Sequence, residues 1–525
     1  MLFTTGNFII FMVIMFFLYY YIIPQNKQWC LLLVGSYFFY ACASPIYLVF
    51  LLFTTIVTYT AAIIMDKNYC RQAKYLETDG KNLSKEEKKE YKTKVSKKQK
   101  ISIAAVTTVI LLMLGIFKYS TFLLRSCSGL FNLFGVSTES ITLKFILPVG
   151  LSFYVFQSLG YCIDVYRGTS TAEHNFFKYM LYVSFFPQLL QGPIGDYNRL
   201  SPQLFKGYEF STTNVIYGLQ RAIWGFFKKL LIANQISTVT GDVWAQYASY
   251  NGFLFWLFML ILYAVELYAD FSGYMDIAVG CAQMLGITLD ENFDAPYFSK
   301  SIAVYWRRWH ITLGAWFRNY VFYSILRADW CNNIRKKLKK RNSYIANTLP
   351  TVIALLIVWL LIGLWHGADW SYVVHGLYHG IFIILSTLLH PFYERFHKRF
   401  PKLQNNSLFM LFQIARTFTI VIFGYLIFSP ANLLVTTGIL KQMFSEFGLM
   451  QTLSFGHLQF SRLLIAAVGT ILLFITDVLK VKQISIDGIL IKQKPWVQFI
   501  AFYLFIMIIC CFGYFGENQF AYFKF

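Results

Sequence analysis

The chain has 525 residues, of which 57% are hydrophobic, 19% aromatic and 14% charged. Soluble proteins carry about 25% charged residues, so this composition excludes a soluble enzyme, a disordered chain and a disulfide-rich secreted domain. The formal net charge of +21 is concentrated in a few connecting segments. It therefore indicates membrane topology rather than nucleic-acid binding, and we predict no nucleic-acid partner.

Apolar segments long enough to cross a membrane recur along the whole sequence, so we expect an all-α, multi-pass protein of the cell membrane. We expect about ten to twelve spans, with one or two re-entrant or interfacial pieces. No internal repeat is visible, which argues against a transporter built from inverted repeats. The predicted apolar segments are 7–23, 29–43, 46–65, 101–124, 145–165, 176–192, 212–232, 251–269, 273–287, 349–365, 371–390, 408–428, 461–479 and 496–515.

Basic connections set the predicted orientation. The connection 66–100 contains 12 Lys or Arg against 6 Asp or Glu, and includes a run, KNLSKEEKKEYKTK, typical of a solvated helix. The connection 327–341 has seven basic residues and one acid. Both are predicted to be cytoplasmic; docking of an acidic carrier protein or of anionic membrane lipid is the alternative role. If 391–402 is cytoplasmic as well, the helical hairpin before it places His366 near the outer end of the membrane.

Four histidines lie in or beside apolar segments, where polar groups are costly and are therefore candidates for function. His366 is the leading candidate, because imidazole titrates near neutrality and can take a proton from a hydroxyl nucleophile. A structural, hydrogen-bonded histidine is the alternative. His375 and His379 share a helix face, but no Glu lies between them as in HExxH, and the nine cysteines show no zinc spacing. We therefore predict no metal site.

The stretch 305–320 mixes aromatic and cationic residues on an expected helix, with His310 within it. An interfacial helix at headgroup depth is the simpler interpretation. In the alternative, arginines hold a phosphate or thioester donor and His310 lies in the reaction chamber. No GxGxxG or P-loop motif is present. The residues predicted to line such a substrate channel are Trp306, Arg307, Arg308, Trp309, Asn319, Trp365 and His379.

Four stretches together resemble the membrane-bound O-acyltransferase (MBOAT) family, in particular the bacterial branch with the alginate O-acetyltransferase and the teichoic acid D-alanyl transferase. They are PVGLSFYVFQSLGYCIDVYRG (148–168), QGPIGDYNRL (191–200), the region 268–320 with YWRRWHITLGAWFRNY, and IGLWHGADWSYVVHGLYHG (362–380). The resemblance implies a polytopic ring of helices around a central catalytic channel. In that channel a cytoplasmic acyl thioester would meet an acceptor that enters from the other side.

The same resemblance implies roles for residues and partners. The invariant histidine of the family corresponds to His366 and the second signature histidine to His310. The donor would be acetyl-CoA or the phosphopantetheine of an acyl carrier protein, with no bound cofactor, and an extracytoplasmic transferase partner would act on the polysaccharide. Three parts are expected: N-terminal helices over 1–144, the catalytic core over 145–390, and C-terminal helices over 391–525.

Two departures leave the subtype open. Asn319 stands where the family usually has Asp. The sequence after Asn319 lacks a glycine-rich run that is typical of the alginate-type enzymes, and in this respect it is closer to the D-alanyl branch. The extra C-terminal spans resemble the alginate-type enzymes instead. We expect transfer of an acyl group, acetyl in the first place, to hydroxyls of a cell-surface polysaccharide. D-alanyl transfer to teichoic acid is the alternative, and a transporter or polymer-export channel is the alternative from another class.

The chain ends in FAYFKF, at residues 520–525. This ending resembles the tail of a small separate membrane protein of D-alanylation systems, whose tyrosine is thought to accept the acyl group. The resemblance implies that Tyr522 is deprotonated by His366, accepts the acyl group and presents it outside the membrane. Chemically, a phenol is more acidic than an alkyl alcohol and its ester is a better acyl donor. An aromatic anchor at the membrane interface is the alternative.

Overall fold

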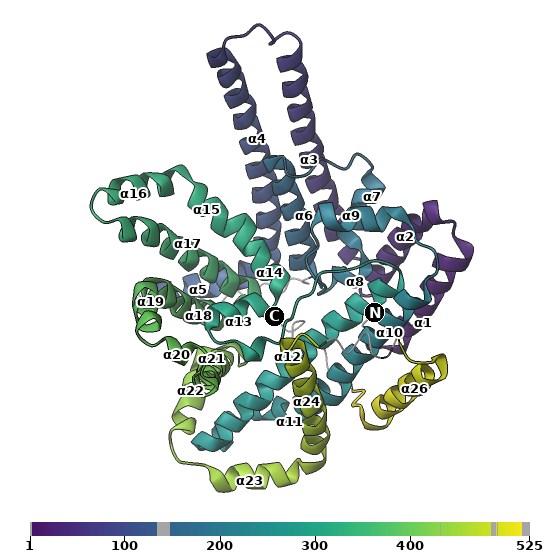
Figure 1. Ribbon diagram of the computed structural model, residues 1–525, viewed down its shortest axis with the longest axis vertical. Coiled ribbons are helices and arrows are strands. Elements are labelled where there is room, and N and C mark those ends of the chain that lie inside the picture. The colour runs from purple at the N-terminus through teal and green to yellow at the C-terminus, as the bar shows by residue number, and fades with distance from the viewer. Residues whose placement is uncertain (1–2, 134–147, 431, 485–489, 491, 517–525) are drawn as a thin grey trace. The chain divides into compact units, whose positions relative to one another are not determined.

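The computed structural model describes residues 3–133, 148–430, 432–484, 490 and 492–516 (Figure 1). In this part of the chain every regular element is helical, and the only β pairing is an isolated bridge between Phe293 and Trp309. The predicted all-α class is thus confirmed. Contacts divide the chain into two units, one formed by Met1–Gly218 with Cys281–Asp290 and one by Leu219–Gly280 with Glu291–Phe525.

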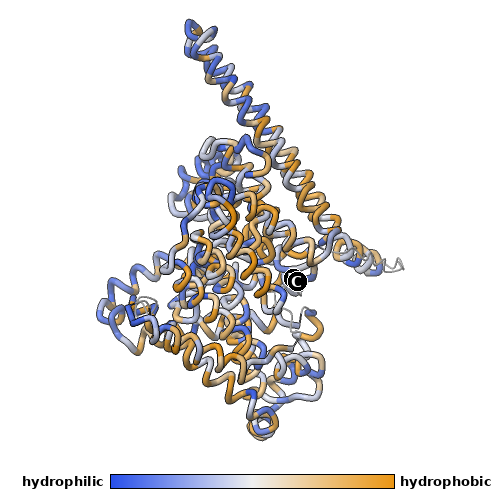
Figure 2. The backbone as a smooth tube through the Cα atoms, turned by 90° about the vertical axis from the view of Figure 1, so that its right-hand side faces the viewer, coloured by the Kyte–Doolittle hydropathy of each residue, from blue (hydrophilic) through white to orange (hydrophobic). Residues whose placement is uncertain are grey.

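The first unit is dominated by the long antiparallel pair of helices α3 and α4, whose far tip is hydrophilic (Figure 2). Ser84 begins α4 with a capping box, in which Glu87 bonds back to the backbone of Ser84. The basic connection 66–100 therefore consists mostly of two helix ends, and the solvated helix predicted for its charged run is the first part of α4. The helices of this unit are α1 (Gly6–Phe17), η1 (Leu18–Ile22), η2 (Gln25–Lys27), α2 (Gln28–Ala41), α3 (Tyr47–Glu77), α4 (Lys85–Leu114), η3 (Gly115–Tyr119), α5 (Ser120–Leu133), α6 (Leu151–Arg167), α7 (Phe176–Ser184), α8 (Phe186–Leu189) and α9 (Tyr197–Lys206).

The chain passes between the units three times: within α10 (Thr212–Phe227), within α12 (Phe253–Met284) and between Asp290 and Glu291. The buried core of the second unit gathers around α12, where Phe255, Trp256 and Leu260 are inaccessible to solvent. The helices of this unit are η4 (Lys228–Ala233), α11 (Asn234–Ala245), η5 (Tyr247–Ser249), η6 (Pro296–Phe298), α13 (Ile302–Arg308), α14 (Ile311–Trp316), η7 (Phe317–Phe322), α15 (Tyr323–Arg327), α16 (Asp329–Lys339), α17 (Ser343–His366), α18 (Trp370–Leu388), α19 (His390–Arg399), α20 (Pro401–Gln404), α21 (Ser407–Phe428), α22 (Leu433–Met443), α23 (Leu449–Leu458), α24 (Phe460–Val481) and α26 (Pro495–Phe512).

Eight helices of the described residues are long and apolar enough to cross a membrane, and the chain is a multi-pass membrane protein. The expected ten to twelve spans included shorter segments that the structure divides. Residues 176–192 form the short helices α7 and α8, and 212–232 pass from α10 into the π-helical η4. The helices that meet the criterion are α3, the continuous run Lys85–Gly129, α12, α17, α18, α21, α24 and α26.

Two sequence expectations about helix continuity were wrong. The segments 251–269 and 273–287 form the single helix α12, because an ion pair with Lys229 neutralises Asp270, which lies between the two segments. Conversely, the helix expected over 305–320 breaks between α13 and α14, where His310 has left-handed backbone (φ 47°).

Helices α17 and α18 form an antiparallel hairpin that positions the candidate site. Its 24-residue first helix, about 36 Å long, is sufficient to cross the hydrocarbon core. The basic helix α16 precedes α17 and the basic helix α19 follows α18, so both lie at one end of the hairpin. His366 lies at the other end.

Candidate active site

His366 is the last residue of α17 and is buried, with 4% of its surface exposed. The centroid of its ring lies 5.0 Å from the ring of Trp365 and 5.3 Å from that of Phe428. Gly367 follows, and a Cβ atom there would come within 2.2 Å of the Tyr372 ring, so only glycine permits this close approach. Aromatic rings thus enclose the imidazole and limit its contact with water.

His375 and His379 continue the row of imidazoles along α18. Ring centroids are 6.0 Å apart for His366 and His375, and 4.7 Å apart for His375 and His379. Nδ1 of His375 lies 2.9 Å from the carbonyl oxygen of Gly424, which can only accept, so Nδ1 carries a proton. A Cβ at Gly424 would lie 2.4 Å from Nε2 of His379, so glycine also makes room for that ring. Three imidazoles therefore lie in one buried row.

Trp306, on α13, packs against the part of this row formed by His375 and His379. Its ring centroid lies 5.1 Å from His379 and 6.4 Å from His375. Among the described residues, Nε1 of Trp306 and both ring nitrogens of His379 have no hydrogen-bond partner. Buried polar atoms are nearly always hydrogen-bonded. These nitrogens can therefore receive a polar group of a substrate.

His310 is held by the loop that precedes α13. Its Nδ1 lies 3.3 Å from Oδ1 of Asn292, which also accepts the backbone N–H and the hydroxyl of Thr312, each at 2.9 Å. The backbone N–H of Thr312 can only donate, which fixes this Asn292 oxygen as an acceptor. Burial lowers the pKa of His310 to about 3, so the ring is neutral at physiological pH. Nδ1 of His310 therefore donates, and Nε2 is left as an acceptor.

Trp365 contacts both His310 and His366, with its ring centroid 5.6 Å from His310 and 5.0 Å from His366. The structure thus brings together five of the predicted site residues in the second unit. They are His310, Trp306, Trp365, His366 and His379.

The remaining predicted residues lie elsewhere. Trp309 is buried against Tyr305, and Arg308 lies 3.7 Å from a carboxylate oxygen of Asp294. Arg307 and Asn319 are exposed. Tyr522 lies outside the described residues. A channel role for these residues stays a prediction.

The family model described as MBOAT, membrane-bound O-acyltransferase family, matches residues 2–429, which include every histidine of this site. The chain belongs to the membrane-bound O-acyltransferase family. Among its relatives is the probable alginate O-acetylase AlgI of Pseudomonas aeruginosa, 34% identical over 341 residues, which are 65% of this chain and 59% of that protein.

The chain is also similar to relatives whose names mention polymers other than alginate. The peptidoglycan O-acetyltransferase of Helicobacter pylori is 31% identical over 318 residues, 55% of this chain and 56% of that protein. The teichoic acid D-alanyltransferase of Bacillus subtilis is 29% identical over 283 residues, 54% of this chain and 68% of that protein. The chain thus spans between 56% and 68% of the length of these three relatives.

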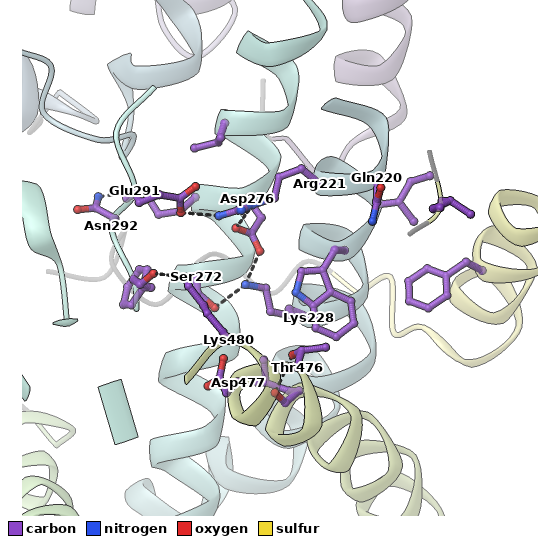
Figure 3. A pocket seen from close by; sticks show the side chains of 18 of the residues that line it. Gln220, Arg221, Lys228, Ser272, Asp276, Glu291, Asn292, Thr476, Asp477 and Lys480 are labelled. Carbon is purple, nitrogen blue, oxygen red and sulfur yellow. Dashed lines mark hydrogen bonds and ion pairs between the residues drawn. The ribbon is translucent and has the colours of Figure 1, made fainter. Parts of the chain in front are cut away.

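A cluster of buried charges joins α10, η4 and α12 in this O-acyltransferase family member, and its cations were not singled out from the sequence. Arg221 and Lys228 both pair with Asp276, at 2.6 Å and 2.5 Å (Figure 3), and Lys229 pairs with Asp270 at 2.5 Å. The available signal was three cations within the otherwise apolar segment 212–232. Arg221, Lys228 and Asp276 line a cavity of about 610 Å³ that also reaches Asn292, the residue that holds His310.

A second cavity of about 730 Å³ lies at the basic end of the α17–α18 hairpin. Lys300, Lys398 and Arg416 line it, together with a single acid, Glu394. The part of α18 that lines this groove begins about one turn from His379 and continues toward the basic end. The groove is therefore cationic and lies on the helix that carries two of the buried imidazoles.

Proposed function

We propose that this chain is an O-acyltransferase that moves an acyl group, acetyl in the first place, from a cytoplasmic thioester toward hydroxyls of an extracytoplasmic polysaccharide. The observation that carries the proposal is the buried row of imidazoles that begins at His366, within the region matched by the family model. The names of the relatives support acetyl as the transferred group and a cell-surface polymer as the acceptor. The alginate and peptidoglycan O-acetyltransferases are more similar to this chain than the teichoic acid D-alanyltransferase of Bacillus subtilis is.

His366 is the general base in this proposal. It takes the proton from the acceptor hydroxyl, whose oxygen attacks the thioester carbonyl. The new C–O bond forms, the C–S bond breaks, and His366 returns the proton to the departing thiolate. The aromatic enclosure of His366 favours this step, because a dry site prevents hydrolysis of the thioester and holds both reactants together. His310, neutral and with Nε2 as an acceptor, would receive a hydrogen bond from the donor side.

The basic groove is a candidate entrance for the donor. Coenzyme A and a phosphopantetheine-bearing carrier both present phosphate, and three cations against one acid favour an anionic ligand. The donor arm would then extend along α18 toward Trp306 and His379, whose buried nitrogens can bond its amide groups. An acidic carrier protein would also be attracted by the basic helices α16 and α19.

Acyl transfer by purified protein in liposomes tests the proposal. With labelled acetyl-CoA, we expect transfer of label from the thioester to the protein or to an added polysaccharide acceptor. Absence of transfer with acetyl-CoA, together with transfer from a D-alanyl carrier protein, would favour the second candidate, D-alanylation, which the Bacillus subtilis relative supports. Absence of transfer from either donor would contradict an acyltransferase.

The tail supplies the proposed first acceptor, Tyr522. In this relay its phenol loses a proton to His366, takes the acyl group as an ester, and presents it to an extracytoplasmic transferase partner. We expect Tyr522→Phe to remove the acyl label from the C-terminal peptide, as measured by mass spectrometry of the digested protein. Tyr503→Phe, which changes an exposed tyrosine of α26, is the matched control and should label like wild type. Undiminished labelling of the tail in Tyr522→Phe would exclude the relay.

Asn292 orients the His310 ring, and substitution of Asn292 should therefore change the rate of acyl transfer. We expect Asn292→Ala to lower the rate constant for acyl transfer about tenfold, because it removes the acceptor that orients the His310 ring. Asn292→Asp keeps an acceptor oxygen and should recover most of the rate, with a pH profile altered by the new charge. Equal losses in both variants would show that the orientation of His310 is unimportant and that Asn292 serves the fold alone.

A further inference from the structure

The charged cavity of about 610 Å³ is completed by the C-terminal helices. One wall consists of α10, η4 and α12, and the other of α24 and α26. The family model ends at residue 429, before either of these last two helices. The cavity therefore depends on a part of the chain beyond the family match, and its ligand need not be the donor or the acceptor of the transfer reaction.

Two charges on α24 face this cavity without a full counter-charge (Figure 3). Asp477 is buried, with 8% exposed, and accepts the hydroxyl of Tyr268 at 2.9 Å and 3.0 Å; no ion pair of the described residues includes it. Lys480 donates to the carbonyl oxygen of Phe293 at 2.8 Å, and its nearest carboxylate oxygen, on Asp294, is 3.9 Å away. Asp477 and Lys480 are three residues apart and so neighbour each other on one helix face.

The other cations of the cavity are already neutralised. Arg221 pairs with Asp276 and Glu291, each at 2.6 Å, and Lys228 pairs with Asp276 and hydrogen-bonds Ser272. The lining charges amount to three cations and three carboxylates, since Asp477 and Lys480 add one of each sign. Such a balanced site favours a ligand that carries both charges over one that is only anionic.

The cavity also has an apolar side, formed by aromatic and aliphatic residues of α10, α24 and α26. Trp224, Leu473, Phe502 and Phe505 belong to it. Of all α26 residues, only Ile509 is buried. The helix is fastened near its C-terminal end, where the carbonyl oxygens of Phe512 and Tyr514 accept from Gln235 and Asn234. The N-terminal half of α26 is thus covered by little protein where it borders the cavity.

We propose that this cavity binds a zwitterionic phospholipid with an ethanolamine headgroup. The ammonium would pair with Asp477 and the phosphate with Lys480, while the acyl chains would lie against the apolar residues of α24 and α26. The spacing suits this ligand because the two opposite charges of ethanolamine phosphate are joined by a short link and the two side chains are separated by one helical turn. Two basic residues at this end of α24, Lys480 and Lys482, favour a position on the cytoplasmic side, where a phospholipid headgroup would be in reach.

Lipid retention by the purified full-length chain tests this site and needs no acyl transfer, so its failure is distinct from failure of the proposed function. Delipidated protein in detergent is offered equimolar phosphatidylethanolamine and phosphatidylglycerol, and bound lipid is counted by native mass spectrometry. We expect about tenfold more phosphatidylethanolamine than phosphatidylglycerol on wild type. Asp477→Asn should abolish this preference, and Lys480→Gln should weaken retention of both lipids.

Lys482→Gln is the matched control, because Lys482 is exposed on the same helix end but does not line the cavity, and it should bind lipid like wild type. Lys480 is partly exposed, so Lys480→Gln keeps the test decisive if Asp477→Asn does not fold. Equal retention of the two lipids, a preference for phosphatidylglycerol, or wild-type retention by Lys480→Gln would overturn the proposal.

Discussion

We expect His366→Ala to lower the rate constant for acyl transfer about a thousandfold, within the range that general bases contribute. The imidazole ends α17 in a setting of aromatic rings, and the ring centroid of His375 lies 6.0 Å away. Water cannot easily replace the base there, because the ring is buried. The loss should appear in turnover at saturating acetyl-CoA, since the groove proposed for the donor lies toward the opposite end of the hairpin.

Two further variants separate loss of the base from loss of the fold. His366→Gln keeps a hydrogen-bonding side chain of similar size but cannot act as a base near neutrality, so it should lose as much activity as His366→Ala. His457→Ala changes an exposed histidine at the end of α23 and should retain wild-type transfer. Wild-type turnover in His366→Gln would show that His366 only orients other groups.

Helix boundaries in the C-terminal half were predictable from hydropathy because the spans there are apolar throughout. The segments 349–365 and 371–390 correspond to α17 and α18, and the polar bend between them falls between His366 and Trp370. Hydropathy identifies such spans because the membrane demands length and apolarity of each helix separately. The end position of His366 could therefore be predicted before any contact was known.

Contacts between distant segments could not be predicted in this way. His375 and His379 were expected on one helix face, but Gly424, which accepts from one ring and makes room for the other, lies on α21. Asn292 likewise gave no local signal of its bond to His310, 18 residues away. Hydropathy and motifs describe single segments, whereas these bonds depend on how the segments pack.

The continuity of α12 shows the same limit in energetic terms. Asp270 lies between the two predicted apolar segments and Asp276 lies within the second, and an isolated carboxylate at either position is costly in hydrocarbon. In the folded chain, Lys229 of η4 pairs with Asp270, and both Lys228 of η4 and Arg221 of α10 pair with Asp276. Ion pairing takes the place of hydration for both carboxylates, so α12 is not interrupted at Asp270 or Asp276.

Asp276→Ala is expected to lower the free energy of unfolding by about 3–5 kcal/mol, because it leaves a buried ammonium without its counter-charge. Lys228 is 4% exposed and Asp276 5% exposed, with 2.5 Å between their charged atoms. Arg221 loses the same carboxylate but keeps Glu291. Unfolding of the purified protein by increasing sodium dodecyl sulfate in mixed micelles, followed by circular dichroism, measures the change.

A double variant distinguishes an uncompensated charge from a simple loss of packing. Asp276→Leu with Lys228→Met replaces the pair by apolar side chains and should recover most of the stability lost in Asp276→Ala, since buried ion pairs are often no more stabilising than apolar residues of similar volume. Glu90→Ala breaks the exposed pair with Lys94 on α4 and should leave stability unchanged. If the double variant were as unstable as Asp276→Ala, the shape of the two side chains, and not their charge, would hold α12 against η4.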